Sequence, residues 1–250
     1  MTLKSKVTPA LILALFAFAW TACDNDDDNA SDGKTNLELQ LTYTINGEAY
    51  EQDAVYDIGG VNTSFNVANF YISNIRVMNE DGEMTIFEDL NLLATPENTT
   101  FELGEVDVDH YHMIRFNIGV QAEENNQSEI DFTSRPANDP LAMQTPAMHW
   151  NWNAGYRFLR VDGLVDTDGD GTPSDVLEIH IGTDNFLTEA AVMLQKDAEY
   201  TDQNIIELEF DIANLFTDID LTTENITHTG DYPDLAIKIK DNIPTAFTKK

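Results

Sequence analysis

The sequence has little cysteine and little positive charge. Cys23 is the only cysteine, so the chain cannot form an internal disulfide framework. It carries 13 Lys and Arg against 45 Asp and Glu, which gives a formal net charge of −32. A field of this sign repels nucleic acid and anionic lipid and attracts cations. We therefore expect no nucleic-acid partner, and cations are the ligands that the charge favours.

The chain also lacks the common catalytic motifs. It contains no Ser-His-Asp nucleophile pattern, phosphate-binding glycine loop, zinc-protease helix or CxxC pair. A pair of carboxylates could always be assembled from so many acids, so such a pair carries no weight. The sequence predicts a binding protein and not an enzyme.

The N-terminus has the pattern of a secretion signal. Lys4 and Lys6 precede an apolar run over residues 10–20, which is too short for the roughly 20 residues that cross a membrane. We expect residues 1–22 to be a cleaved signal peptide. The Thr-Ala-Cys that ends at Cys23 resembles the lipobox of bacterial lipoproteins, so Cys23 is the predicted lipidation site. Ordinary cleavage nearby, leaving a free cysteine, is the alternative.

Residues 23–36 are acidic and contain nothing large enough to start a core, so we expect a solvated tether. Acidic residues directly after a lipidated cysteine resemble an export tag for the outer face of the outer membrane. The predicted location is therefore an outer-membrane lipoprotein at the cell surface, with the periplasmic face as the alternative.

Residues 37–250 show short segments of alternating apolar and polar residues between turn residues, which is typical of half-buried antiparallel strands. Leu37, Leu39, Leu41 and Tyr43 share one face of the first of them. The predicted fold class is mainly β, an antiparallel β-sandwich with long loops and little helix. Residues 123–146 are expected to form a long loop, Asp211 to cap a short helical turn, and residues 234–239 to be either helix or strand.

Five blocks of the sequence form a recognisable series. Residues 148–163 read MHWNWNAGYRFLRVDG, and the other blocks are FYISNIR at 70–76, FNIGV at 116–120, IHIG at 179–182 and IKDNI at 239–243. These blocks resemble, in the same order, those of the MbnP-like family of copper-binding proteins, whose most diagnostic block reads Met-x-Trp-x-Trp-x-x-Gly-Tyr followed by a strand that ends in acid-Gly.

This resemblance implies copper held by histidine and, in some members, by a tryptophan that a di-haem peroxidase-like partner oxidises to kynurenine. Indole offers copper no usable lone pair, whereas ring opening yields an aniline nitrogen and a ketone; neutral imidazole suits copper as well. Trp150 and Trp152 are the candidates for modification and His180 is the best-matched ligand. His149 is a second candidate through its proximity alone.

Packing alone could also explain several of these residues. Trp150, Trp152 and Tyr156 have the even spacing of one strand face, and large aromatic side chains usually pack in cores. His228 lies in a polar segment, and we expect it to be solvated.

A second candidate metal site is the acidic segment DTDGDGTPSD at residues 166–175. Asp166, Asp168 and Asp170 alternate ahead of a glycine, which resembles the calcium loops of EF-hand, dockerin and thrombospondin-repeat proteins. The backbone carbonyl of Thr172 would be the next calcium ligand along the loop. Asp175 or Glu178 would replace the bidentate glutamate of an EF-hand. We expect calcium in a structural role, and a merely acidic hairpin turn is the alternative.

Together these patterns predict a copper-binding or copper-handling envelope lipoprotein with a structural calcium loop. The alternative is a calcium-stabilised surface adhesion or carbohydrate-binding module, in which exposed tryptophans would stack on sugars.

Overall fold

The structure is a computed structural model, and it describes residues 34–107, 111–151, 154–194 and 204–250. The predicted signal peptide, Cys23 and Trp152 lie outside the described residues. The first strand begins at Lys34, so the predicted tether ends before residue 36.

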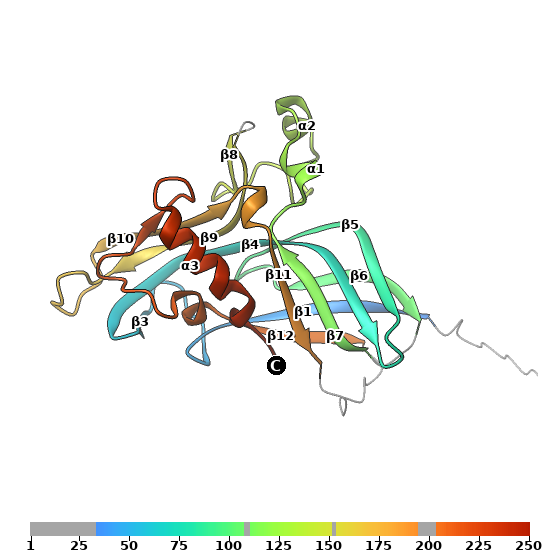
Figure 1. Cartoon of the computed structure of the whole chain (residues 1–250), viewed down its shortest axis with the longest axis horizontal. Helices are drawn as coiled ribbons and strands as arrows, with labels where there is room; N and C mark the ends of the chain where they lie inside the picture. Colours follow the sequence, from blue (N-terminus) through green and yellow to red (C-terminus); the bar gives the residue numbers. More distant parts are fainter. Residues whose placement is uncertain (1–33, 108–110, 152–153, 195–203) are drawn as a thin grey trace, which may run out of the picture. The chain divides into compact units, whose positions relative to one another are not determined.

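Strands predominate, as the sequence predicts, and Figure 1 shows their arrangement. The strands are β1 (Lys34–Ile45), β2 (Glu48–Ala49), β3 (Val55–Ile58), β4 (Val61–Asn79), β5 (Met84–Ala94), β6 (Thr100–Asp107), β7 (Tyr111–Ile118), β8 (His149–Asn151), β9 (Gly155–Val165), β10 (Asp175–Gly182), β11 (Thr188–Met193), β12 (Ile205–Asp211), β13 (Ile226–Thr227) and β14 (Phe247–Lys249). The helices are α1 (Ala122–Asn125), α2 (Glu129–Thr133) and α3 (Pro233–Asn242), with 3₁₀ turns η1 (Asp184–Phe186), η2 (Ile212–Phe216) and η3 (Ile243–Ala246).

The strands form a five-stranded and a nine-stranded sheet. In the smaller sheet β14, β12, β1 and β2 lie in that order, and β6 also pairs with β1. The larger sheet is organised around β4. The first half of β4 pairs with β3 and β9, and beyond β9 the sheet continues with β10 and β13. The second half of β4 pairs with β5 and β7, and beyond β7 the sheet continues with β11. The β1–β12 and β10–β13 pairs are parallel, which the expected antiparallel sandwich did not include.

Alternation along the strands buries one face of each sheet against the other. The predicted face of β1 is confirmed, because Leu37, Leu39, Leu41 and Tyr43 are all buried. Aromatic rings join the two layers: Phe70 of the larger sheet lies 4.6 Å from Phe210 of the smaller one, measured between ring centroids. Burial of such side chains contributes roughly 25 cal/mol per Å² of apolar surface and is the main stabilising term.

A smaller core lies beneath the segment between β7 and β8. Its members are Tyr71, Val120, Leu141, Met148, Tyr156 and Phe158. The loop expected at residues 123–146 contains α1 and α2, and α2 begins at a capping box between Ser128 and Asp131. This small core fixes the start of β9 and the neighbouring β8.

Two further local predictions are resolved. The Asp211 carboxylate accepts a hydrogen bond from Ala213 N at 3.0 Å, so the predicted cap of η2 is confirmed. Residues 234–239 are helical, within α3. No helix in the described ranges is both long enough and apolar enough to cross a membrane.

Candidate metal centres

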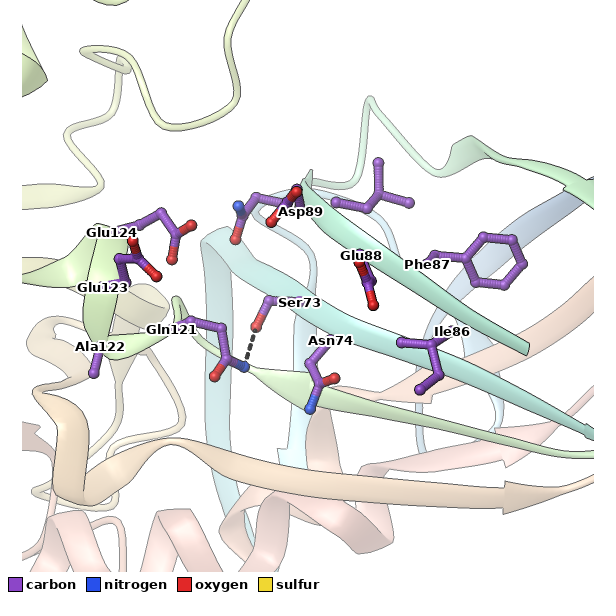
Figure 2. Close-up of a pocket in the computed structure, with 12 residues that line it drawn as sticks. Ser73, Asn74, Ile86, Phe87, Glu88, Asp89, Gln121, Ala122, Glu123 and Glu124 are labelled. Atoms are coloured by element: carbon purple, nitrogen blue, oxygen red, sulfur yellow. Dashed lines mark hydrogen bonds between the residues drawn. The ribbon is translucent and has the colours of Figure 1, made fainter. Parts of the chain in front are cut away.

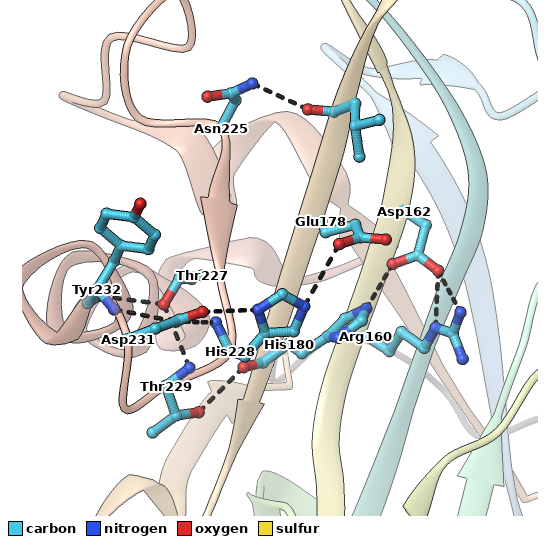
Figure 3. A network of polar contacts seen from close by, with 11 residues as sticks. Arg160, Asp162, Glu178, His180, Asn225, Thr227, His228, Thr229, Asp231 and Tyr232 are labelled. Atoms are coloured by element: carbon cyan, nitrogen blue, oxygen red, sulfur yellow. Dashed lines mark hydrogen bonds and ion pairs between the residues drawn. The ribbon is translucent and has the colours of Figure 1, made fainter. Parts of the chain in front are cut away.

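The β9–β10 hairpin places Asp162 and His180 on one face of the larger sheet. The two strands pair in antiparallel register, with Arg160 opposite His180 and Glu178 opposite Asp162. His180 Nε2 lies 2.7 Å from Asp162 Oδ1, and Arg160 Nε donates to Asp162 Oδ2 at 2.7 Å (Figure 3). Because an ionised carboxylate only accepts hydrogen bonds, the ring hydrogen belongs on Nε2.

The other ring nitrogen of His180 is free. The residue is only 4% exposed, and within the described ranges no hydrogen-bond partner reaches Nδ1. A buried polar atom left without a partner costs about 1–3 kcal/mol. A carboxylate that holds one imidazole nitrogen while the other presents its lone pair is the usual arrangement around metal-binding histidines. The surroundings of His180 therefore fit those of a nitrogen ligand.

Asp162 remains ionised in this setting. Burial by itself raises the pKa of its carboxyl group, but the hydrogen bonds from His180 and Arg160 outweigh that effect and hold the pKa below its ordinary value. A carboxylate at this position fixes the imidazole tautomer.

His228 is a member of this cluster, and its prediction as a merely solvated residue is wrong. Its ring centroid lies 4.8 Å from that of His180, at an interplanar angle of 71°. His228 Nδ1 lies 2.8 Å from Asp231 Oδ2, and Nε2 lies 3.3 Å from Glu178 Oε2 (Figure 3). A carboxylate three residues after His228 was the only local signal for its role.

The Thr229 side chain fastens the His228 loop to the backbone of β10. Thr229 Oγ1 donates to the carbonyl of His180 at 3.0 Å and accepts from Gly182 N at 3.0 Å. Both interactions are buried. The contact between the two histidine rings is therefore a fixed feature of the fold.

Trp150 lies at the end of the same hairpin. Its indole packs so closely on Gly182 that a Cβ added there would lie 2.4 Å from Trp150 Cζ3. The Arg157 guanidinium lies 5.5 Å from the centroid of the indole. Trp150 and His228 both line a pocket of about 760 Å³, together with Phe186. One tryptophan of the block at residues 148–163 thus shares a pocket with His228, one member of the histidine cluster.

His149 has a different environment, because neighbouring residues of a strand point to opposite sides. Its ring stacks on Phe132 at 3.9 Å and meets Tyr156 edge-on at 4.9 Å, both between centroids. Burial, with a smaller contribution from Arg157, lowers its pKa. No hydrogen bond or ring contact joins His149 to His180 in the described part of the chain, so the structure does not support its assignment as a second ligand beside it.

The acidic segment forms the loop at the opposite end of the β9–β10 hairpin. Asp166, Asp168 and Asp170 each offer an oxygen within 4.8 Å of the others. Asp166 is buried and accepts hydrogen bonds from Gly169 N at 2.9 Å and Gly171 N at 2.8 Å. The alternation predicted from the sequence does bring these three carboxylates together.

The remaining predicted ligands of this loop have different positions. Asp175 begins β10 and accepts a hydrogen bond from the Thr167 hydroxyl, and Thr172 N donates to Asp170 Oδ1 at 2.8 Å. Glu178 lies three residues into β10, where its carboxylate faces His228. Its assignment as a calcium ligand is therefore not supported, since the strand carries it away from the loop.

A separate acidic pocket of about 490 Å³ lies between β4, β5 and α1 (Figure 2). Its lining includes Glu88, Asp89, Glu123 and Glu124 and no basic residue. Gln121 Nε2 donates to Ser73 Oγ across it at 3.2 Å. Exposed acidic groups are common without a bound ion, so this charge alone does not define a site.

Comparison with known proteins tests the resemblance seen in the sequence. Residues 34–230 match the model of the MbnP family. The solved structure of MbnP from Methylosinus trichosporium has a similar fold, with a TM-score of 0.57, 16% sequence identity, and coverage of 81% of this chain and 87% of that chain. No curated protein matches significantly by sequence. The solved structure supports the fold alone at this identity, and the family match spans most of the sequence. The chain belongs to the MbnP family.

Proposed function

We propose that this protein binds and handles copper, with His180 as the central ligand, and that it catalyses no reaction of its own. The observation that carries the proposal is the buried Nδ1 of His180, which lacks a partner within the described residues while Asp162 holds Nε2. Imidazole nitrogen is a good copper donor in either oxidation state. The His228 ring lies against that of His180, with 4.8 Å between the ring centroids, and would supply the second imidazole.

Trp150 is the better candidate for conversion to kynurenine among the residues whose position is described. It lines the same pocket as His228 and packs against Gly182, two residues after His180. Opening of its indole by a di-haem peroxidase-like partner would create an aniline nitrogen beside the histidines. Trp152 remains the second candidate.

We further propose that the loop of Asp166, Asp168 and Asp170 binds calcium in a structural role. Their clustered oxygens suit a hard cation, which takes six to eight oxygen ligands. The loop joins β9 to β10, so a bound ion would hold together the two strands that carry Asp162 and His180.

The proposed setting is the bacterial envelope. The signal-like N-terminus and Cys23 support a lipid-anchored protein of the outer membrane, exposed at the cell surface or in the periplasm. The net charge of −32 favours cations as its ligands.

The decisive experiment is metal analysis of the protein purified from its own host, where any oxidising partner is present. We expect bound copper in the wild-type protein and its loss in His180→Gln. His112→Gln is the control, because His112 lies on β7, outside the β9–β10 hairpin, and its side chain is partly buried. Peptide mapping of the same material should show that Trp150 or Trp152 has lost a carbon and gained an oxygen.

Two outcomes would contradict the proposal. One is native protein with intact tryptophans and no transition metal. The other is equal copper content in His180→Gln and the wild type. Intact tryptophans whose fluorescence responds to glycans and not to copper would support the carbohydrate-binding alternative.

A further inference from the structure

Four methionines form a continuous row across the second half of the larger sheet. Of the seven methionines in the chain, Met84, Met78, Met113 and Met193 lie directly opposite one another on β5, β4, β7 and β11, strands that Figure 1 shows together. Met78 pairs with Met84 on one side and with Met113 on the other, and Met113 pairs with Met193. The row therefore spans four neighbouring strands without a gap.

All four side chains project from the outer face of the sheet. Residues directly opposite on paired strands point to the same side, and neighbours along a strand point to the other. The neighbours Val77, Ile114 and Val192 are buried in the core. Met84 is 43% exposed and Met193 60% exposed, and Met78 and Met113 are partly buried. Core packing does not account for this row.

The spacing suits convergence of sulfur atoms on one ion. Paired strands lie about 4.7–4.9 Å apart, and each methionine has three rotatable side-chain bonds. Neighbouring thioethers can therefore turn toward a point between their strands. Thioether sulfur is a soft, neutral donor that selects copper(I) over calcium, magnesium or manganese.

We propose that this methionine row is a second metal site, which binds a soft monovalent cation such as copper(I) through Met78 and Met113 with Met84 and Met193 beside them. The site is independent of the histidine cluster. It lies on the half of β4 that pairs with β5 and β7, whereas the hairpin of Asp162 and His180 joins the other half.

The contact between Arg115 and the Met113 sulfur must break when a metal binds that sulfur. Arg115 Nε donates to Met113 Sδ at 3.2 Å, which shows that this sulfur is accessible to a donor. The charge of Arg115 is offset by Glu189, whose Oε1 lies 3.0 Å from Arg115 Nη1 and whose other oxygen contacts Arg76. Met113 must rotate away from Arg115 to join a metal.

The test is a titration with silver(I), a soft monovalent ion that undergoes no redox change, on the full chain carrying ¹³C-methyl methionine. The His180→Gln background removes the nitrogen ligand of the proposed copper centre. We expect the methyl resonances of Met78 and Met113 to shift most, and those of Met84 and Met193 to shift in the same titration by a smaller amount. Met143, which is 76% exposed and outside the row, should not respond.

Substitutions then test the ligands. Met78→Leu with Met113→Leu should weaken silver binding at least about tenfold, the lower end of the loss seen even for residues that only support a ligand. Met-to-Leu exchange preserves volume and is usually tolerated. Met143→Leu is the matched control and should leave the affinity unchanged.

The proposal is overturned if silver(I) shifts the methyl resonances of the row no more than that of Met143. It is also overturned if the Met78→Leu, Met113→Leu variant binds silver(I) as tightly as its parent. If the methyl resonances of the row do not respond to silver(I) but broaden when another protein is added, the row is a docking surface, and this result would also overturn the proposal. Copper content of host-purified His180→Gln, compared with His180 intact in the same Met78→Leu and Met113→Leu background, tests the histidine centre without the row, so the two ideas can fail independently.

Discussion

The two ends of the β9–β10 hairpin collect donors in different ways. At the loop end, three carboxylates come from alternate residues of one short segment, Asp166, Asp168 and Asp170, and backbone N–H groups of the same loop hold them. At the other end, His180 depends on Asp162 from the facing strand and on His228 from a distant loop. The loop site is local and largely exposed, and the histidine site is long-range and buried.

Because their donors differ, the two ends of the hairpin suit different kinds of metal ion. Oxygen donors on an exposed loop suit a hard cation that holds two strands together. A buried imidazole with its tautomer fixed by a carboxylate suits a transition metal. One hairpin therefore carries a candidate structural site and a candidate functional site, and changes at one end should leave the other intact.

The largest effect is expected from Asp162→Asn, which should lower copper affinity by roughly 10- to 100-fold, the range for residues that orient a metal-binding histidine. The new amide can present N–H to His180 Nε2, which would move the ring hydrogen to Nδ1 and block the ligand. Competition titration with a copper chelator measures the change.

Asp139→Asn is the matched control for that substitution, because Asp139 is also a partly buried carboxylate paired with an arginine, at 2.8 Å. Its copper affinity should equal the wild-type value. The calcium-dependent stability of Asp162→Asn should be unchanged as well. Equal affinities for Asp162→Asn and wild type would show that Asp162 does not orient the ligand.

Calcium removal should have the next largest effect, at the other end of the hairpin. A ligand present at 100 times its Kd stabilises the native state by about 2.7 kcal/mol, so chelation should lower the unfolding temperature of the wild-type protein. Asp170→Asn should remove this dependence, because it deletes one of the three clustered charges. Thermal unfolding with calcium and with chelator measures it.

Asp81→Asn, in an exposed turn between β4 and β5, is the control and should keep the calcium response. A calcium response of the same size in Asp170→Asn, or none in the wild type, would rule out the loop as a calcium site.

The sequence predicted best what depends on neighbouring residues. The buried face of β1, the Asp211 cap and the clustering of Asp166, Asp168 and Asp170 all follow from periodicity or spacing within a short segment. Each is set by local backbone geometry, in which alternate strand residues share a face and a short polar side chain caps the following turn.

Features that depend on strand register could not be predicted from the sequence. The Asp162–His180 pair requires the antiparallel pairing of β9 and β10, and the position of His228 beside His180 requires the parallel pairing of β13 with β10. The parallel β1–β12 pair joins distant parts of the chain in the same way. Apart from Asp231, three residues after His228, nothing local marks such contacts, because they are fixed only when the whole sheet assembles.

The smallest of these effects is expected from Gly182→Ala, which tests whether Trp150 is held against the hairpin. A Cβ at this position would lie 2.4 Å from Trp150 Cζ3 and 2.4 Å from the carbonyl oxygen of Tyr156. The indole and the β9 backbone would both have to move, and overpacking of this kind typically costs about 1–3 kcal/mol. Urea unfolding measures the loss of stability, and tryptophan emission reports the displaced indole.

Gly230→Ala is the matched control, because Gly230 lines the same pocket and a Cβ there has nothing within 4 Å. Its stability and emission should remain those of the wild type. If Gly182→Ala leaves both unchanged too, the indole is not packed on β10, and the link between Trp150 and the histidine end of the hairpin is lost. If only Gly182→Ala shifts the emission and also lowers copper content in the host, the indole and His180 belong to one centre. The calcium response at the far end should then be untouched.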